Sequence, residues 1–269
     1  MSHSNAGVVA VAATSVAACM VVALGAFVLR PVSTIEVEGG LRLVLEIDPG
    51  APRQDVAAGE VIGASIPVMQ RRLREMDVAN GKVRPEGEDR VVIDLAGASD
   101  HERARKLADV VARAGRLEFR MVDKASPDEA WRARIRRADD LLYETVAGEK
   151  LPMLVKKEVV ADGNDLIDAQ VSLDYRTGDP IVNFKFSNTG GLKFARATQE
   201  NVGQRFAIVL DGEVISAPVI REPILGGSGQ ISGVSTMESA NDLAILLRVG
   251  ALPVTYKLVE IREVPPATR

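Results

Sequence analysis

Leu41–Asp48, LRLVLEID, has leucine at positions 41, 43 and 45, which is the alternation of a strand with one buried face. A stripe of apolar residues at helical spacing follows it, made of Ile62, Ile66, Met69, Leu73 and Met76. Pro67 lies within this stripe. We expect the helix to begin near Ser65, because proline is tolerated in the first turn, where its missing amide costs no hydrogen bond.

Further elements follow in a regular order. A hairpin is predicted from two strand-like runs and the polar turn between them, Val78–Arg84, Arg90–Leu95 and Pro85-Glu86-Gly87-Glu88. Ser99 and Glu102 have capping-box spacing and predict the start of a second helix, which Gly115 can end. Leu117–Val122 then predicts another strand.

The resulting order is strand, helix, strand, strand, helix, strand. It is the order of a ferredoxin-like split βαβ unit, in which both helices cover one face of an antiparallel sheet. Hydrophobic residues make up 46% of the 269 residues and aromatic residues only 4%, so the core must be mainly aliphatic. We therefore expect an α+β fold with a ferredoxin-like base subdomain over residues 31–122.

Residues 123–233 predict an inserted α+β head subdomain with its own core. Ser126 and Pro127 begin a predicted helix, whose buried stripe would be Trp131, Ile135, Ala138 and Leu142. The other predicted elements are strands at Leu154–Val160 and Ile181–Phe186, a helix at Gly191–Val202 and a hairpin at Arg205–Ile220. Asp211-Gly212 in this hairpin is typical of a type I′ turn, which needs positive φ.

Residues 234–269 predict a helix and a strand that return to the base. Ser235 and Glu238 have capping-box spacing, and Gly250 ends the helix. Val254–Val264 is expected to be a long final strand.

The N-terminal residues 1–30 predict a transmembrane anchor. Ala6–Leu29 contains no charged residue and is long enough, at about 1.5 Å per residue, to span a hydrocarbon core of about 30 Å. A cleaved signal peptide and a lipoprotein signal at Cys19 are the alternatives. No lysine or arginine precedes the segment, and the apolar run continues past Cys19 to Arg30, so we favour an uncleaved, single-pass anchor with the main domain in the periplasm.

The residue inventory predicts no enzyme and assigns no catalytic, cofactor-binding or metal-binding residues. One cysteine and two histidines, His3 and His101, are too few for a histidine-based zinc site or a conventional triad. Gly226–Gln230 misses the last glycine of a nucleophile elbow and lacks a P-loop lysine, so a mobile surface loop is expected there. The formal net charge of −4 does not favour a nucleic-acid partner, and the basic run Arg132–Arg137 is interpreted as a solvated helix face.

Gln204–Ile261 resembles the end of the first periplasmic domain of the SecD family of the Sec preprotein translocase. The most distinctive matching blocks are Ala207–Asp211, Val214–Pro218, Gly229–Ile231, Ala240–Leu243 and Leu246–Pro253. Earlier blocks of the same domain are similar to Gln70–Leu73, Arg90–Ile93 and Leu117–Arg120. Of the family's opening GLDLRGG block only Gly39-Gly40 remains.

This resemblance implies a base and a head standing on the outer face of the inner membrane beside a SecY-type channel. In that family the head is thought to hold emerging preprotein while proton flow through further membrane helices drives its movement. Those helices would follow Arg269, so we expect no proton coupling by this chain alone. The implied partners are SecF, the SecY-type channel, unfolded preprotein and the inner membrane. No cofactor and no preprotein-binding residue is implied.

Two functions remain open. The first is a SecD-like accessory protein that binds emerging preprotein on the periplasmic side and assists export. The second is a membrane-anchored scaffold or regulator of the SecF-containing complex that does not touch substrate.

Overall fold

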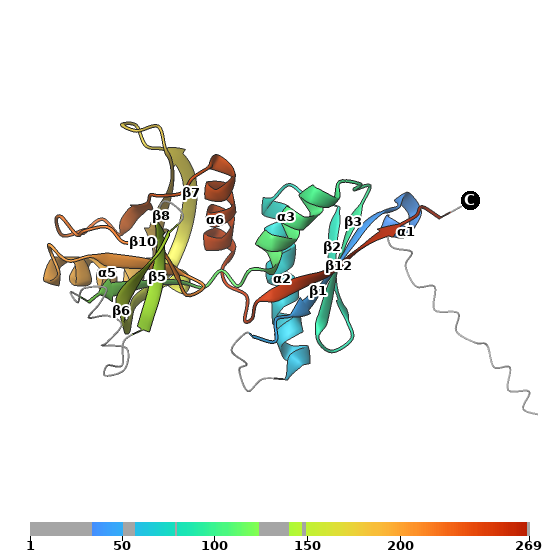
Figure 1. Cartoon of the computed structure of the whole chain (residues 1–269), viewed down its shortest axis with the longest axis horizontal. Coiled ribbons are helices and arrows are strands. Elements are labelled where there is room, and N and C mark those ends of the chain that lie inside the picture. Colours follow the sequence, from blue (N-terminus) through green and yellow to red (C-terminus); the bar gives the residue numbers. More distant parts are fainter. Residues whose placement is uncertain (1–33, 51–56, 79, 124–139, 147–148, 268–269) are drawn as a thin grey trace, which may run out of the picture. The chain divides into compact units, whose positions relative to one another are not determined.

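The computed structural model describes residues 34–50, 57–78, 80–123, 140–146 and 149–267, all within one unit, Ser33–Arg269 (Figure 1). The predicted anchor at residues 1–30 lies outside the described residues. None of the helices within the described ranges is long and apolar enough to cross a membrane.

One antiparallel sheet has the strand order β12-β1-β3-β2. Its strands are β1 (Gly40–Ile47), β2 (Gly81–Glu86), β3 (Arg90–Ala96) and β12 (Tyr256–Val264). Leu43 lies opposite Ile261 on one side and Ile93 on the other, which places β1 in the centre. The predicted alternation of leucines in β1 is confirmed, because Leu41, Leu43 and Leu45 are all buried in one core.

Two helices supply the other half of this core, α2 (Ala58–Glu75) and α3 (His101–Ala112). Met69 and Leu73 from α2 meet Leu107 and Val111 from α3 in the same cluster. A short helix, α1 (Thr34–Glu38), precedes β1 and contacts β3. We call this sheet and its helices the base.

Leu117–Val122 is a strand, β4, but the prediction that it completes the base sheet is wrong. It pairs with β6 and β9 in a separate barrel, and β12 takes the place beside β1. All residues of β4 except Glu118 are buried, on both faces of the strand. Such a strand fits the centre of a two-sided core better than a sheet covered by helices on one face.

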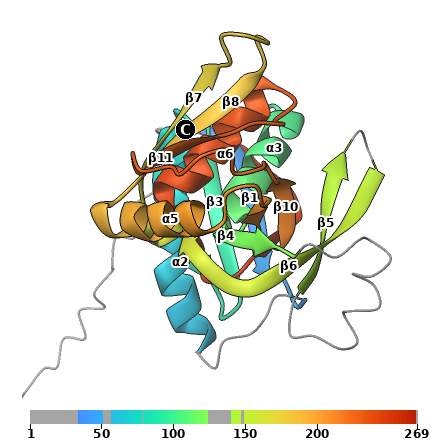
Figure 2. The same ribbon diagram turned by 90° about the vertical axis from the view of Figure 1, so that its left-hand side faces the viewer.

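The remaining strands form a closed barrel and a three-stranded sheet, which together we call the head. The barrel order is β10-β5-β6-β4-β9, with β5 (Asp140–Val146), β6 (Glu149–Asp162), β9 (Phe206–Leu210) and β10 (Glu213–Ser216). The sheet order is β11-β8-β7, with β7 (Leu166–Leu173), β8 (Pro180–Phe186) and β11 (Ser228–Ile231). Figure 2 shows the β7–β8 hairpin beside α6 (Met237–Val249).

Five phenylalanines form the centre of the head core: Phe119, Phe184, Phe186, Phe194 and Phe206. The ring of Phe119 lies 5.1 to 6.1 Å from the other four ring centroids. Phe194 comes from α5 (Asn188–Glu200), and α6 adds an aliphatic face that includes Leu243 and Leu247. The barrel strands bury their opposite face in a second, smaller cluster.

Two predicted helices differ from the structure. α2 begins at Ala58 and not near Ser65, so Pro67 lies inside the helix. Because proline has no amide hydrogen, the carbonyl of Gly63 lacks its usual partner in the helix. Gly63 and Pro67 are both exposed, so water can donate to that oxygen. The second difference concerns the predicted helix whose apolar stripe runs from Trp131 to Leu142. Its end overlaps Asp140–Val146, which is the strand β5 and pairs along its length with β6. The earlier part of that prediction, and the basic run, lie outside the described residues.

Helix caps are displaced by one residue from their predicted positions. The Asp100 carboxylate, and not Ser99, accepts the amides of Glu102 and Arg103 at the start of α3. Thr236, and not Ser235, caps α6 by accepting the amide of Ser239. A carboxylate or hydroxyl one residue later reaches the N2 and N3 amides equally well, which sequence spacing alone does not distinguish.

The turn at Asp211-Gly212 is confirmed. Both residues have positive φ, 53° and 85°, and Leu210 pairs with Glu213 across a two-residue loop. The prediction of a mobile loop at Gly226–Gln230 is wrong for its second half, because Ser228–Ile231 pairs with β8 as β11. The strand β7 has no counterpart among the predicted elements.

Candidate functional site

Arg72 is the most unusual buried group of the described residues. It lies in the last turn of α2 and is fully buried. Its guanidinium donates to the carbonyls of Val110, Val111, Arg113, Ala114 and Gly250. Burial lowers the pKa of Arg72 to about 10, partly opposed by the charge of Asp211, so the group stays charged at neutral pH.

Val110 and Val111, two of the residues whose carbonyls bind Arg72, lie in the last turn of α3. The carbonyls of Arg113, Ala114 and Gly250 belong to the two chain segments that connect the base with the head. One segment leads from α3 to β4 and the other from α6 to β12. The amide of Leu252 in the second segment donates to the carbonyl of Ala114 in the first, at 2.7 Å. Gly115 has φ of +72°, and a Cβ there would lie 2.8 Å from Arg72 Nη2, so glycine is required at this position.

Asp211, in the β9–β10 turn, fixes the first of these segments from the other side. Its carboxylate accepts the amides of Gly115 and Arg116 at 3.1 and 2.7 Å and pairs with Arg113 at 3.0 Å. Arg248 provides a further link, because it pairs with Glu75 of α2 at 2.8 Å and donates to the Ala169 carbonyl of β7. The hydrogen-bonded junction therefore joins α2, α3 and α6 with the strand β7 and the β9–β10 turn of the head.

Several segments that carry the family resemblance meet at this junction. Gln70–Leu73 supplies Arg72, Leu246–Pro253 supplies the Gly250 carbonyl, and Ala207–Asp211 supplies the Asp211 carboxylate. These blocks are far apart in the sequence, and no spacing rule predicted that they would meet.

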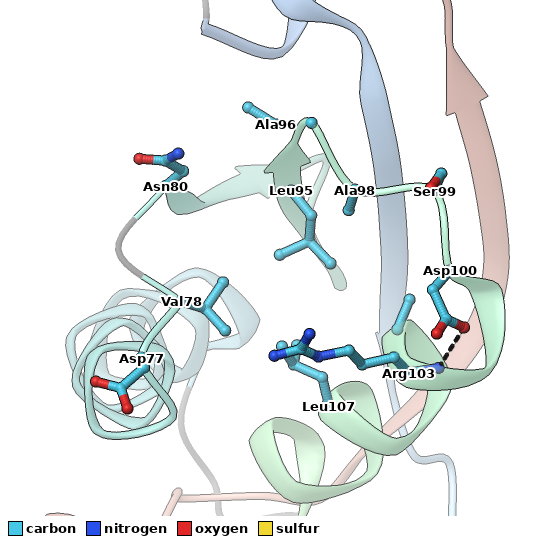
Figure 3. A pocket seen from close by; sticks show the side chains of 12 residues that line it. Asp77, Val78, Asn80, Leu95, Ala96, Ala98, Ser99, Asp100, Arg103 and Leu107 are labelled. Atoms are coloured by element: carbon cyan, nitrogen blue, oxygen red, sulfur yellow. Dashed lines mark hydrogen bonds between the residues drawn. The ribbon is translucent and has the colours of Figure 1, made fainter.

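A hollow of about 450 Å³ opens in the base between the α2–β2 turn and the first half of α3. Its apolar side includes Val78, Leu95 and Leu107, and Figure 3 shows the Arg103 side chain reaching across it from α3 toward Val78. Asp77, with φ of 58°, lies at the opposite rim. The hollow could accommodate an aliphatic side chain, but nothing at its rim defines a reaction.

The head exposes apolar side chains on two neighbouring segments, α5 with its C-terminal turn and residues 219–227. The amide of Ile224 donates to Thr198 Oγ1 at 3.0 Å, and Gly203 donates to the carbonyl of Ile220 at 2.8 Å, so the two segments run together. We call their exposed residues the α5 apolar strip: Leu192 (73% exposed), Leu225 (71%), Val219 (51%) and Val202 (48%).

The amphipathic character of α5 explains one part of this strip. Gly190, Phe194 and Thr198 recur at a spacing of four and face the head core, whereas Leu192 lies on the outer face. Exposed apolar side chains gathered on adjoining segments are a feature of interaction surfaces, so the α5 apolar strip is a candidate contact surface. Sequence reasoning assigned no preprotein-binding residue, because exposure of Leu225 and Val219 depends on loop packing.

No group of three or more histidine, cysteine, aspartate or glutamate side chains within the described ranges could hold a metal ion. His101 opens α3, is exposed and lies 3.4 Å from Glu263.

Comparison with family models gives two matches. Residues 139–254 match the SecDF P1 head subdomain, and residues 62–124 match the N-terminal part of the P1 domain of protein translocase subunit SecDF.

Among solved structures, a crystal structure of SecDF in the super-membrane-facing form superposes with a TM-score of 0.66 at 30% identity, over 85% of this chain and 31% of that one. Another, of SecDF as a membrane component that enhances protein export, gives 0.62 at 30% identity, over 82% of this chain and 99% of that one.

Curated relatives agree with these matches. The chain is 38% identical to protein translocase subunit SecD of Acetobacter pasteurianus over 230 residues, and 36% identical to protein translocase subunit SecDF of Thermus thermophilus over 244 residues. Each alignment covers 86% of this chain, but only 42% and 31% of the relative. The chain therefore spans less than half the length of these two relatives.

Proposed function

Because the chain belongs to the SecD/SecDF family of protein translocase subunits, we propose that it assists protein export by binding emerging preprotein on the periplasmic side of the inner membrane. We assign it this binding role without an enzymatic activity, a cofactor or a proton-coupled step of its own. The α5 apolar strip is the observation that supports the role most directly, since an unfolded chain exposes the apolar side chains that such a strip can contact.

The proposal extends to architecture and partners. The order β12-β1-β3-β2 with α2 and α3 on one face supports a ferredoxin-like base, and the buried faces of β4 and α6 support a head that extends from Leu117 to Val249. SecF, a SecY-type channel and an N-terminal anchor in the inner membrane complete the proposed setting. The net charge of −4 gives no reason to add nucleic acid.

Binding of a reduced, unfolded secretory protein to the full-length chain, measured across an ionic-strength series, tests the proposal. Apolar and backbone contacts should make the affinity nearly independent of salt, since screening weakens only charge pairs. Replacing Leu192 and Leu225 together by serine should weaken binding at least about tenfold, because both side chains are exposed and contribute little to folding.

Val37→Ser is the matched control, because Val37 is 54% exposed in α1 of the base. It should leave binding unchanged. Equal binding by the double variant and the control would reject the strip as the contact surface. Total absence of binding by the natural chain, together with stable capture of SecF or the channel, would favour the scaffold function.

A further inference from the structure

The tip of the β7–β8 hairpin presents an exposed aromatic ring. Tyr175 is 92% exposed, and Leu173 beside it is 57% exposed. The guanidinium of Arg176 lies 5.6 Å from the centroid of the Tyr175 ring. Figures 1 and 2 both show the β7–β8 connection projecting past α6.

The tip is held in one conformation by its own hydrogen bonds. The Asp174 carboxylate accepts the amides of Arg176 and Thr177 at 2.8 and 3.3 Å. The backbone of Asp174 also pairs with Gly178 and Asp179, both at 2.8 Å. The amide of Arg176 is the main cause of the lowered pKa of Asp174. A loop ordered in this way loses little backbone freedom on binding, so the ordering cost of contacts at Tyr175 is confined to its side chains.

The root of the hairpin is anchored as well. Arg248 of α6 donates to the Ala169 carbonyl of β7 at 2.8 Å and pairs with Glu75 of α2. The Asp168 carboxylate accepts the Ala169 amide at 2.8 Å. The backbone groups of Ala169 on the outer edge of β7 are thus already bonded, so this part of the edge cannot accept an added strand. The tip of the hairpin remains available for contact.

The chemistry of the tip selects a class of partner. Tyrosine and arginine are the residue types that most often carry binding energy at protein interfaces. Asp174 and Asp179 outnumber Arg176 within Asp174–Asp179, so the tip has a net charge of −1 and would be repelled by an anionic membrane surface. A projecting ring also needs a hollow to enter, which a folded protein offers and an extended chain does not.

We propose that Leu173–Asp179 is a docking point for a folded protein partner, with Tyr175 entering an apolar hollow and Arg176 pairing with a carboxylate at its rim. The Asp174 carboxylate lies 3.9 Å from Arg176 and already accepts backbone amides, so the guanidinium can donate to a second carboxylate. This surface is separate from the α5 apolar strip and does not depend on preprotein binding.

The test uses the full-length chain in the cells that make it, with p-benzoylphenylalanine as the photo-crosslinker in place of Tyr175. The expected result is one discrete protein adduct that persists after translation has been stopped long enough to clear export precursors. Arg176→Glu should reduce the adduct about tenfold or more, since it replaces an ion pair by a repulsion. The same crosslinker at Glu88, in the exposed β2–β3 turn, is the control and should not give that adduct.

Mass spectrometry of the crosslinked peptide should locate an apolar hollow with a nearby aspartate or glutamate. Reversing that carboxylate to lysine should restore the adduct with the Arg176→Glu chain. Adducts with many secreted chains that vanish when translation stops would overturn the proposal in favour of preprotein contact. Adducts with lipid alone, or no adduct from position 175, would overturn it outright.

Discussion

Arg72 shows how one residue can hold separate parts of a chain. Its five acceptors are neutral carbonyls from segments 38 to 178 residues away in the sequence, and its Nε has no hydrogen-bond partner within the described ranges. A buried cation without an adjacent carboxylate is costly, and the hydrogen bonds offset that cost only while all the carbonyls stay in place. The sequence placed Arg72 in a block that resembles the family but did not indicate which groups its side chain contacts.

Arg72→Met should lower the free energy of unfolding by about 2 to 4 kcal/mol, because it leaves five buried or partly buried carbonyls without this donor. Arg72→Lys should cost less, since an ammonium keeps the charge but reaches fewer acceptors. Arg71→Met is the matched control, because Arg71 is the exposed neighbour, and should change stability by no more than about 0.5 kcal/mol. Urea unfolding measures all three. Equal stability of the two methionine variants would show that the carbonyls do not need Arg72.

Asp242 makes stability depend on pH. Burial and the nearby Glu238 raise the pKa of its carboxyl group, while Lys106 and Arg113 across the cleft oppose this. The folded chain therefore binds this proton more readily than the unfolded chain, so its contribution to stability is present at low pH and is lost as pH rises through the raised pKa. Asp242→Asn should be slightly more stable than the natural chain at pH 7, with a difference that shrinks on acidification. A difference that stays constant with pH in thermal melts would contradict this assignment.

At the level of elements, the pattern of apolar residues and turns predicted the positions of the strands better than it predicted their pairing partners. The alternating leucines of β1, the β2–β3 hairpin and the Asp211-Gly212 turn are confirmed, because period and turn chemistry are local properties. The last base strand was misassigned because β4 and β12 both follow a helix. Only the buried faces of β4 decide between them, and burial is a property of the folded molecule.

Pro67 is a local conflict that tertiary packing overrides. Val61, Ile62, Met69 and Leu73 are buried along α2, and this continuous face keeps the helix intact across the proline. Pro67→Ala should raise the free energy of unfolding by about 1 to 2 kcal/mol, because it restores an amide that can donate to the Gly63 carbonyl. The gain is reduced because the unfolded chain becomes more flexible without the proline ring. A decrease in urea unfolding experiments would show that the ring itself stabilises α2.

At the scale of the molecule, one hydrophobic core stabilises the base, and a main core with a smaller cluster in the barrel stabilises the head. Four of the five phenylalanines of the head core lie within Phe184–Phe206, on β8, α5 and β9, whereas Phe119 on β4 comes from much earlier in the chain, so no local pattern indicated that it would join them. Met76, at the end of α2, packs against both cores. The family resemblance is confirmed and was readable from short blocks. The α5 apolar strip could not be predicted from the sequence, because it depends on which apolar residues the folded loops leave exposed.

The central claim is that the head contacts preprotein during export, and crosslinking to a stalled secretory precursor in cells tests it most directly. Photo-crosslinkers at Leu192 and Leu225 should each form adducts with the precursor, whereas one at Val37 in the base should not. Adducts should disappear when the precursor is not expressed. If neither head position captures the precursor while the chain still associates with the translocase channel, the account is contradicted and a scaffold that does not touch substrate replaces it.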